Sequence, residues 1–276
     1  MVSNNLLKIL AMLLPEISND ETINQYGHQK KYFNGEYKTY EKYELENWRV
    51  SYIRRIFNGL NISSNHIVND DLYLDIGVGG SGYTVIEAAK IGCRSVGVDI
   101  SSEGIKKARF FAKNEGESCD FIVCSADKLP FKNDVFSKVS CIAVLEHIPN
   151  DKAAIKEISR VTKGGGKIFI TVPNTFKRMN PLFWLPYWIQ DIKVGHLRHY
   201  SAKALIAIFE SEGFVLKDLI YYPHFIGVIQ KFLCVLFPKM AVSRDSRVWW
   251  KLEELDLKMK GIPTALNFNI IMKKVV

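Results

Sequence analysis

The stretch Asp75-Ile76-Gly77-Val78-Gly79-Gly80-Ser81-Gly82 decides the fold class of this chain. It ends the short apolar run Leu72–Ile76 and opens the amphipathic segment Tyr83–Lys90. Glycines let the backbone turn sharply and leave room for a ligand against bare main chain. The N-terminus of the next helix offers unpaired N–H groups to an anionic group. A strand, a glycine loop and a helix in this order predict the ligand-binding loop of an α/β protein.

Short apolar runs alternate with amphipathic segments from residue 72 onward, which predicts right-handed βαβ units and a parallel sheet. The expected strands are Leu72–Ile76, Arg94–Val98, Asp120–Cys124, Val135–Val144, Lys167–Val172, Phe214–Tyr221 and Ala265–Lys273. The expected helices are Tyr83–Lys90, Ser102–Asn114, Asp151–Thr162 and Ser201–Glu212, the last capped by Ser201 and ended by Gly213. We therefore predict a doubly wound α/β fold with a mostly parallel, seven-stranded sheet whose last strand runs antiparallel.

Three further segments lie outside this alternation. Residues 1–66 are expected to form an N-terminal helical extension or lid, and residues 67–276 the main domain. Within that domain, residues 173–200 form a lid-like insertion rich in proline and aromatics, too irregular to be one helix. Residues 223–262 are predicted to be a helical insertion before the last strand, with helices at Phe225–Phe237 and Asp245–Lys260.

Composition narrows the class of protein. The chain has 276 residues with 47% hydrophobic and 24% charged residues, which is typical of a globular protein with a sizeable core. The formal net charge is +8, but the basic residues are scattered, so a nucleic-acid partner is not expected. The five cysteines include no C-x-x-C pair, which argues against a disulfide framework or a zinc site and for a reducing, cytoplasmic location.

Two apolar segments raise the question of membrane contact. Leu6–Leu14 is interrupted by Lys8 and is too short to span a bilayer, so we expect a helix that packs on the domain or touches a membrane. Phe225–Leu233 is also very apolar. Core packing is its first interpretation, and a membrane-facing surface is the second, since Lys231, Lys239 and Arg244 are near.

Asp99 ends the second expected strand, one βα unit after the glycine loop. An acid at this place can accept both hydroxyls of a ribose, although a helix cap for Ser102–Asn114 is the alternative. The loop and Asp99 suit two cofactors, because Gly77, Gly79 and Gly82 also match the dinucleotide pattern of nicotinamide enzymes. Asp75 favours the other cofactor, because an acid there repels a pyrophosphate and attracts the amino group of an amino-acid moiety.

Further short motifs follow the glycine loop in a set order. They are Gly97-Val98-Asp99-Ile100-Ser101, Ala126-Asp127-Lys128-Leu129-Pro130-Phe131, Val144-Leu145-Glu146-His147-Ile148, Lys163-Gly164-Gly165-Gly166, Val172-Pro173-Asn174 and Gly195-His196-Leu197-Arg198-His199-Tyr200. With them, residues 72 to about 222 resemble the class I S-adenosylmethionine-dependent methyltransferases, which have a Rossmann-like fold. The resemblance is greatest to the small-molecule group that includes the ubiquinone-biosynthesis enzymes, and residues 1–66 and 223–262 lie outside it.

The resemblance implies a cofactor, S-adenosyl-L-methionine, and a set of residues that bind it. The methionine part would be held by Asp75 and the loop and flanked by the end of the fourth strand. Residues further along the chain would hold the ribose and the adenine. The implied set is Asp75, Gly77, Gly79, Gly80, Gly82, Asp99, Ile100, Ala126, Asp127, Ala143 and Val144. The family's third loop glycine usually stands at the place of Ser81, and here Gly82 follows it.

Three histidines are candidates for a general base, which a methyltransferase need not have. His147 follows the fourth strand on the expected acceptor side, and a near-neutral imidazole can take a proton from an attacking hydroxyl. The alternative is that it only shapes the pocket wall. His196 and His199 are rival bases, or structural ties between their loop and the core. No metal-ligand spacing is visible, so no metal is predicted.

The predicted reaction is methyl transfer to a small or lipophilic acceptor, prenylated or glycan-linked, with O- or C-methylation favoured. Enzymes that methylate base or glutamine nitrogens have an N/D-P-P-Y/F motif at the end of the fourth strand. This chain has Val144-Leu145-Glu146-His147 there, which argues against methylation of such nitrogens. The alternatives are a nicotinamide oxidoreductase, opposed by Asp75 and the later motifs, and a non-catalytic cofactor-binding partner protein, opposed by the intact loop with Asp99 and Asp127.

Overall fold

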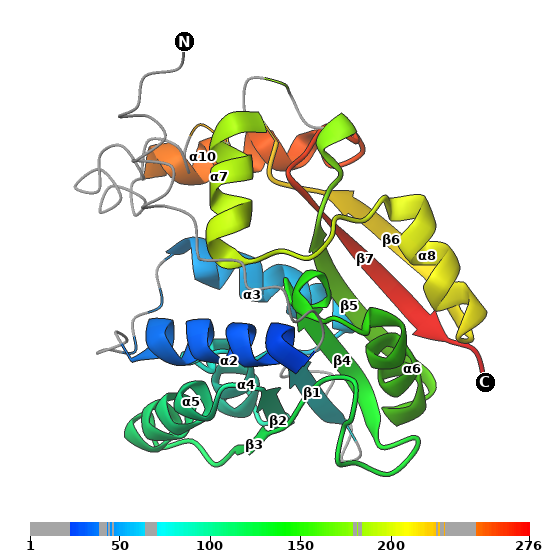
Figure 1. The fold of residues 1–276 in the computed structure, drawn as a ribbon. Helices are drawn as coiled ribbons and strands as arrows, with labels where there is room; N and C mark the ends of the chain where they lie inside the picture. The colour runs from blue at the N-terminus through cyan, green and yellow to red at the C-terminus, as the bar shows by residue number, and fades with distance from the viewer. Residues whose placement is uncertain are drawn as a thin grey trace.

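The computed structural model describes residues 23–38, 43, 45, 47–63, 71–178, 181, 184–224, 226, 229 and 247–276. At its centre is a seven-stranded sheet in the order β3-β2-β1-β4-β5-β7-β6 (Figure 1). The strands are β1 Leu72–Ile76, β2 Arg94–Asp99, β3 Asp120–Val123, β4 Phe136–Ile142, β5 Thr162–Pro173, β6 Phe214–Tyr221 and β7 Asn267–Lys274.

Strand pairing confirms the predicted topology. Strands β3, β2, β1, β4 and β5 pair in parallel, and β7 pairs antiparallel with both β5 and β6. The chain leaves β1 toward β2 on one side and returns to β4 on the other, so the strand order reverses between β1 and β4. In such sheets, ligands bind beyond the carboxyl ends of the strands at this reversal.

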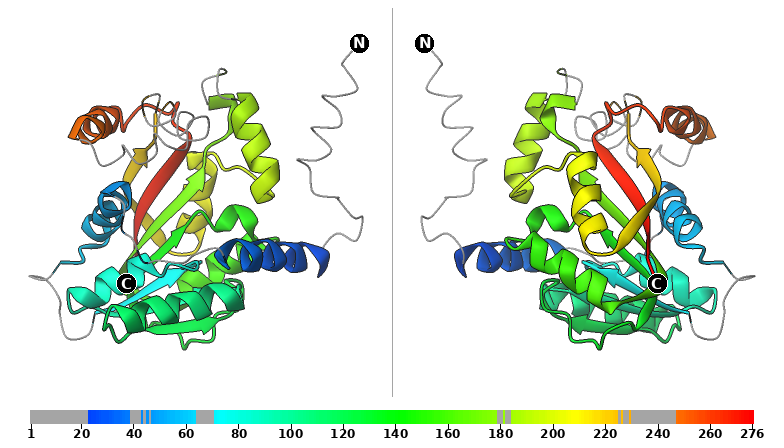
Figure 2. Two further views of the ribbon diagram at one scale, coloured as in Figure 1. Left: turned by 90° about the vertical axis from the view of Figure 1, so that its left-hand side faces the viewer. Right: turned by 90° about the vertical axis from the view of Figure 1, so that its right-hand side faces the viewer.

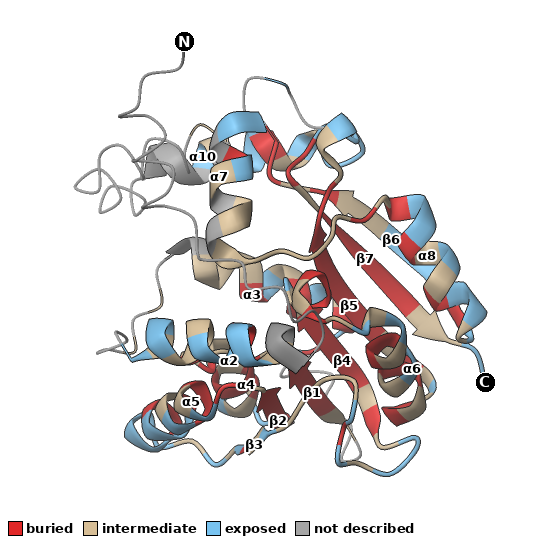
Figure 3. Cartoon of the chain, viewed as in Figure 1, coloured by how far each residue is buried: buried red, intermediate tan, exposed pale blue. Residues whose placement is uncertain are grey.

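Helices cover both faces of the sheet (Figure 2). On one face, α3 (Asn47–Leu60), α4 (Tyr83–Lys90) and α5 (Ser102–Asn114) pack against the strands through two apolar clusters. On the other, α6 (Asp151–Val161) and α8 (Ala202–Ser211) close the largest apolar cluster. The sheet between them is largely buried, whereas the outer sides of α5 and α8 are exposed (Figure 3).

The expected helices and strands form close to their predicted bounds, for the expected local reasons. Ser201 accepts a hydrogen bond from the Ala204 backbone N–H at the start of α8, and Gly213 ends that segment with a left-handed φ of +85°. The main difference is β5, which starts at Thr162 directly after α6 and not at Lys167. Thr162 pairs with Phe136, and the register shifts before the next pair, Lys167 with Lys138. The glycines between Thr162 and Lys167 in β5 permit this irregularity.

The segments outside the sheet are partly described. In the N-terminal extension, α2 (Ile23–Tyr37) contacts α5, and α3 packs on the sheet. The described residues of the 173–200 insertion include a 3₁₀ turn η2 at Phe176–Arg178 and α7 at Trp184–Val194.

The predicted helix Asp245–Lys260 forms as α10, Arg247–Lys258. The predicted segment Leu6–Leu14 lies outside the described residues, as does most of Phe225–Phe237. Among the described residues, no helix combines the length and apolar character needed to cross a membrane.

Candidate cofactor and active site

A cavity opens at the carboxyl ends of β1, β2 and β4, where the strand order reverses. Its lining combines the residues at these strand ends with residues of α2, namely Tyr26, Gln29, Phe33, Tyr37, Ile76, Gly77, Val98, Asp99, Ile100, Cys124, Ser125, Ala126, Ile142, Ala143, Val144, His147 and Ile148. Six of the residues predicted for the cofactor therefore meet at one site: Gly77, Asp99, Ile100, Ala126, Ala143 and Val144.

The glycine loop needs glycine for two separate reasons. Gly77, Gly79 and Gly82 have φ values of +74°, +67° and +63°, which other residues rarely adopt. At Gly77 the space is also closed, because an added Cβ would lie 2.1 Å from Cγ2 of Val144. The loop after β1 thus lies directly against the end of β4, and Gly82 starts α4 from the left-handed conformation.

Asp99 is fixed at the cavity wall by backbone donors. It is 7% exposed, and its two carboxylate oxygens accept hydrogen bonds from Gly79 N–H at 2.9 Å and Ser101 N–H at 2.8 Å. Burial raises the pKa of this carboxyl, and the backbone hydrogen bonds oppose that rise. The helix-cap alternative fails, since the side chain of Ser101 caps α5 by accepting from Gly104 N–H. A carboxylate oxygen accepts more than one hydrogen bond, so Asp99 keeps capacity for hydroxyl donors.

Asp75 lies beneath the loop and does not line the cavity. Its carboxylate is 4% exposed and accepts hydrogen bonds from the hydroxyls of Thr84 and Ser140. Burial raises its pKa to about 6, and the two hydroxyl hydrogen bonds oppose this rise. Asp75 therefore ties α4 and β4 to the glycine loop, and any effect of its charge on a ligand acts across the loop backbone.

Replacing Asp75 by asparagine is expected to flatten the dependence of stability on pH. Folding raises the pKa of this carboxyl, so its protonated form favours the fold at low pH, and that contribution is lost as pH rises through about 6. A shift of this size corresponds to about 3 kcal/mol. Between pH ~4 and ~7, the free energy of unfolding of Asp75→Asn should rise relative to wild type by up to that amount. Urea unfolding at both pH values measures this, with exposed Asp120→Asn as the control. Parallel curves for Asp75→Asn and wild type would contradict the assignment.

The adenine side of the cavity departs from the simple expectation. Ile100 and Ala126 line it as predicted, but the Asp127 carboxylate accepts a hydrogen bond from the Tyr26 hydroxyl of α2. Burial and the neighbouring Asp127 raise the pKa of Tyr26 to about 12, so this hydroxyl keeps its proton. Asp127 thus has a partner from the N-terminal extension at the edge where the resemblance implies an adenine amino group.

Residues 1–66 were predicted to form an extension or lid, but no residue of α2 was predicted to line the site, and four residues of this helix line the cavity. Gln29 donates to the Gly195 carbonyl at 2.7 Å, and Asn34 accepts from the Ser101 hydroxyl at 2.6 Å. Tyr37 packs so closely on the loop that a Cβ atom added to Gly80 would lie 2.9 Å from the Cβ atom of Tyr37. The recurring aromatics of this segment were the available signal, but their spacing alone does not show which surface they cover.

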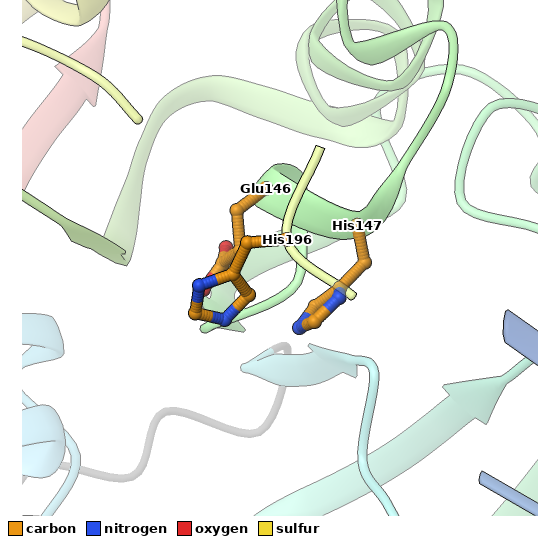
Figure 4. Close-up of side chains that lie close together, drawn as sticks. All are labelled: Glu146, His147 and His196. Atoms are coloured by element: carbon orange, nitrogen blue, oxygen red, sulfur yellow. The ribbon is translucent and has the colours of Figure 1, made fainter. Parts of the chain in front are cut away.

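The three histidine candidates form one group through ring contacts, and Figure 4 shows two of them, His147 and His196, close together. His147 ends the 3₁₀ turn η1 (Leu145–His147) and is the one of the three that lines the cavity. Its ring lies edge-on to Phe33 at 5.4 Å and to His196 at 4.7 Å between centroids. Burial and the neighbouring His196 lower the pKa of His147 to about 4, which leaves the imidazole neutral at neutral pH.

The other two histidines meet at Asp191 of α7. Its Oδ1 atom accepts from His196 Nδ1 and from His199 Nε2, the latter at 2.9 Å. Backbone contacts hold their loop against η1, since Leu197 N–H donates to the Glu146 carbonyl at 2.9 Å. The motif that the sequence singled out therefore joins the 173–200 insertion to the end of β4.

These features define a class. The seven-stranded sheet with one antiparallel strand, the glycine loop and an acid at the end of β2 beside the cavity form the class I methyltransferase fold. Residues 74–170 match the family model described as "Methyltransferase domain". These residues are therefore similar to methyltransferase domains, and the fold around them is that of the class I methyltransferases.

Curated relatives of the chain match part of its length. The ubiquinone biosynthesis O-methyltransferase of Idiomarina loihiensis is 37% identical over 105 residues, 37% of this chain and 42% of that protein. The enzyme of the same name from Parvibaculum lavamentivorans is 28% identical over 181 residues, 60% of this chain and 71% of that protein. The chain spans less than two thirds of the length of the first curated relatives it matches, at 42% and 61%.

Solved structures show the same fold at low sequence identity. The geranyl diphosphate C-methyltransferase of Streptomyces coelicolor, solved with Mg²⁺, geranyl diphosphate and S-adenosyl-L-homocysteine, has a TM-score of 0.63 at 15% identity and covers 91% of this chain and 98% of its own. The [4+2]-cyclase SpnF has a TM-score of 0.58 at 18% identity and covers 86% of both chains. The fold thus extends well beyond residues 74–170.

Proposed function

We propose that this protein transfers a methyl group from S-adenosylmethionine to a small or lipophilic acceptor, with O- or C-methylation favoured over methylation of base nitrogens. The observation that carries this proposal is the Asp99 carboxylate, fixed by Gly79 and Ser101 N–H groups at the wall of a cavity that also exposes the glycine loop. Such a carboxylate suits a ribose with two free hydroxyls.

The bound cofactor supplies a methyl group on a sulfonium, and the protein has to orient it and keep water away. Asp99 would hold the ribose, and Ile100 and Ala126 would contact the adenine. Gly77, Ala143 and Val144 would flank the methionine chain, since all three line the cavity. Ala143 has a φ of +53°, a conformation that is rare for alanine, and such strained positions cluster at ligand sites, which supports this placement.

The N-terminal extension would act as the cover of this site. Tyr26, Gln29, Phe33 and Tyr37 of α2 line the cavity, and hydrogen bonds join α2 to Asp127, Gly195 and Ser101. In this proposal the cofactor lies between α2 and the strand ends, and the covering aromatic rings exclude water from the reacting groups.

A lipophilic acceptor fits the surface beside the histidines. A second hollow is lined by Phe176, Lys177, Trp184, Leu185 and Trp188, and the last three are 44%, 65% and 44% exposed. Phe176 also lies against His199, with ring centroids 4.6 Å apart. This apolar surface is continuous through ring contacts with the group that contains His147, and exposed apolar patches of this kind mark ligand or partner contacts.

The first test is cofactor choice. S-adenosylhomocysteine is expected to bind the purified full chain in calorimetry, whereas NAD is not, because the site offers one ribose-binding acid beside a covered cavity. Ligand at about a hundred times its dissociation constant should add roughly 2.7 kcal/mol of thermal stability.

Turnover is then measured by mass spectrometry of cell extract incubated with isotope-labelled S-adenosylmethionine. Labelled product together with S-adenosylhomocysteine binding supports the proposal. Stabilisation by NAD alone would indicate an oxidoreductase, and cofactor binding without any labelled product would indicate a non-catalytic binding protein.

A further inference from the structure

Three side chains from two distant parts of the sequence converge beside the cavity (Figure 4). Glu146 and His147 come from η1, and His196 comes from the loop after α7. One potential ligand atom from each lies within 4.8 Å of the others. Hydrogen bonds fix the two parts together, because Arg198 donates to the carbonyls of Ile148 and Pro149.

Two of these groups contain buried polar atoms that lack a hydrogen-bond partner in the described part of the chain. Glu146 is 1% exposed, and neither of its carboxylate oxygens has a partner there. The Nδ1 atom of His147 is also buried and lacks one. Burying an unpaired carboxylate is costly, so buried charges are normally paired or coordinate a metal. Among the described residues, the carboxylate of Glu146 has no hydrogen-bond partner. Its convergence with two imidazoles points to a metal ion as the missing partner.

The third group is oriented by a carboxylate behind it. His196 Nδ1 bonds to Asp191 Oδ1, and because a carboxylate only accepts, this nitrogen carries the proton. The lone pair of His196 is then on Nε2. The same Asp191 oxygen accepts from His199, which holds the carboxylate in place. Metal-binding histidines almost always have their other nitrogen bonded to such a carboxylate or carbonyl group.

We propose that Glu146, His147 and His196 bind a divalent transition-metal ion, with Asp191 and His199 as positioning residues. Two imidazoles and one carboxylate suit zinc, iron or cobalt and are a poor set for magnesium or calcium, which take oxygen ligands. Three protein ligands leave at least one coordination position open, as in catalytic rather than structural sites.

The site adjoins the acceptor side of the cofactor cavity, since His147 belongs to both. Resting on the proposed function, the open position would bind an acceptor oxygen and hold it toward the cofactor methyl. The metal site itself does not depend on that function, because its ligands and their orientation stand without a cofactor.

The test is binding of Zn²⁺ and Co²⁺ to the chelator-treated full chain, measured by calorimetry and elemental analysis. We expect one ion per chain. His196→Ala and Glu146→Gln should each lower the affinity by at least a hundredfold. Asp191→Asn removes no proposed ligand but disturbs the orientation of His196 and His199, and it should lower the affinity by about 10–100-fold. His28→Ala removes an exposed histidine of α2 and should leave it unchanged.

Two further measurements keep the outcome decisive. Circular dichroism shows whether each variant is folded, and the visible spectrum of bound Co²⁺ should change in folded His147→Gln because one nitrogen ligand is lost. Absence of stoichiometric binding, or equal binding by His196→Ala and His28→Ala, would overturn the proposal. S-adenosylhomocysteine binding, measured separately without metal, tests the proposed function. If the chain binds S-adenosylhomocysteine but no metal, the metal site is wrong. If it binds metal but no S-adenosylhomocysteine, the proposed function is wrong.

Discussion

Replacing Asp99 by alanine is expected to lower the affinity for S-adenosylhomocysteine by at least two orders of magnitude while the protein stays folded. In the proposed complex the carboxylate accepts two ribose hydroxyls, and each hydrogen bond to a charged group contributes about 1.5–3 kcal/mol. The same substitution leaves Gly79 N–H and Ser101 N–H without their acceptor, which loosens the loop at the cofactor. Both effects weaken binding.

Calorimetry with S-adenosylhomocysteine measures this loss. Asp120→Ala is the matched control, because Asp120 begins the neighbouring strand β3 with an exposed side chain and lies outside the cavity. Asp99→Asn keeps an acceptor and the size of the side chain, so its loss should be smaller than that of alanine. Unchanged affinity in folded Asp99→Ala would mean that the carboxylate serves only the loop backbone.

The sheet could be predicted from the sequence because its signals are local. Buried strands such as β1 and β4 are short apolar runs, and each helix between them carries its own start and stop residues. The parallel order then follows from the alternation, since crossover connections have one hand. The start of β5 was missed because Lys163 and three glycines carry no apolar pattern, so only pairing with β4 reveals that strand.

The cofactor wall was predictable for the same reason, because strand ends of a known sheet order meet at one edge. The contacts of the predicted lid were not, since Tyr26 and Asp127, which bond at the cavity edge, lie 101 residues apart in the sequence. The grouping of Glu146 with His196 was missed in the same way. Spacing along the chain suggested no metal ligands, and only the docking of the 195–200 loop on η1 brings these side chains together. Asp75 shows the converse limit, because a motif position does not reveal which way its carboxylate points.

The second large effect is expected at His147. It alone of the three candidate histidines both lines the cavity and contacts another of them, so a substitution there should act on the acceptor and not on the cofactor. His147→Ala is expected to lower turnover by roughly a hundredfold or more, the usual contribution of a group that handles a proton or orients the attacking atom. Affinity for S-adenosylhomocysteine should stay near that of wild type.

Steady-state kinetics and calorimetry on His147→Ala, His147→Gln, His196→Gln and His199→Gln separate the roles. Glutamine keeps much of the volume of the ring, so near-normal turnover in His147→Gln would show that the residue only shapes the wall. His199 reaches the site only through Asp191, so His199→Gln should lose less turnover than His147→Ala. If His196→Gln or His199→Gln instead loses as much as His147→Ala, the group that acts on the acceptor lies on the 195–200 loop and the assignment to His147 is wrong.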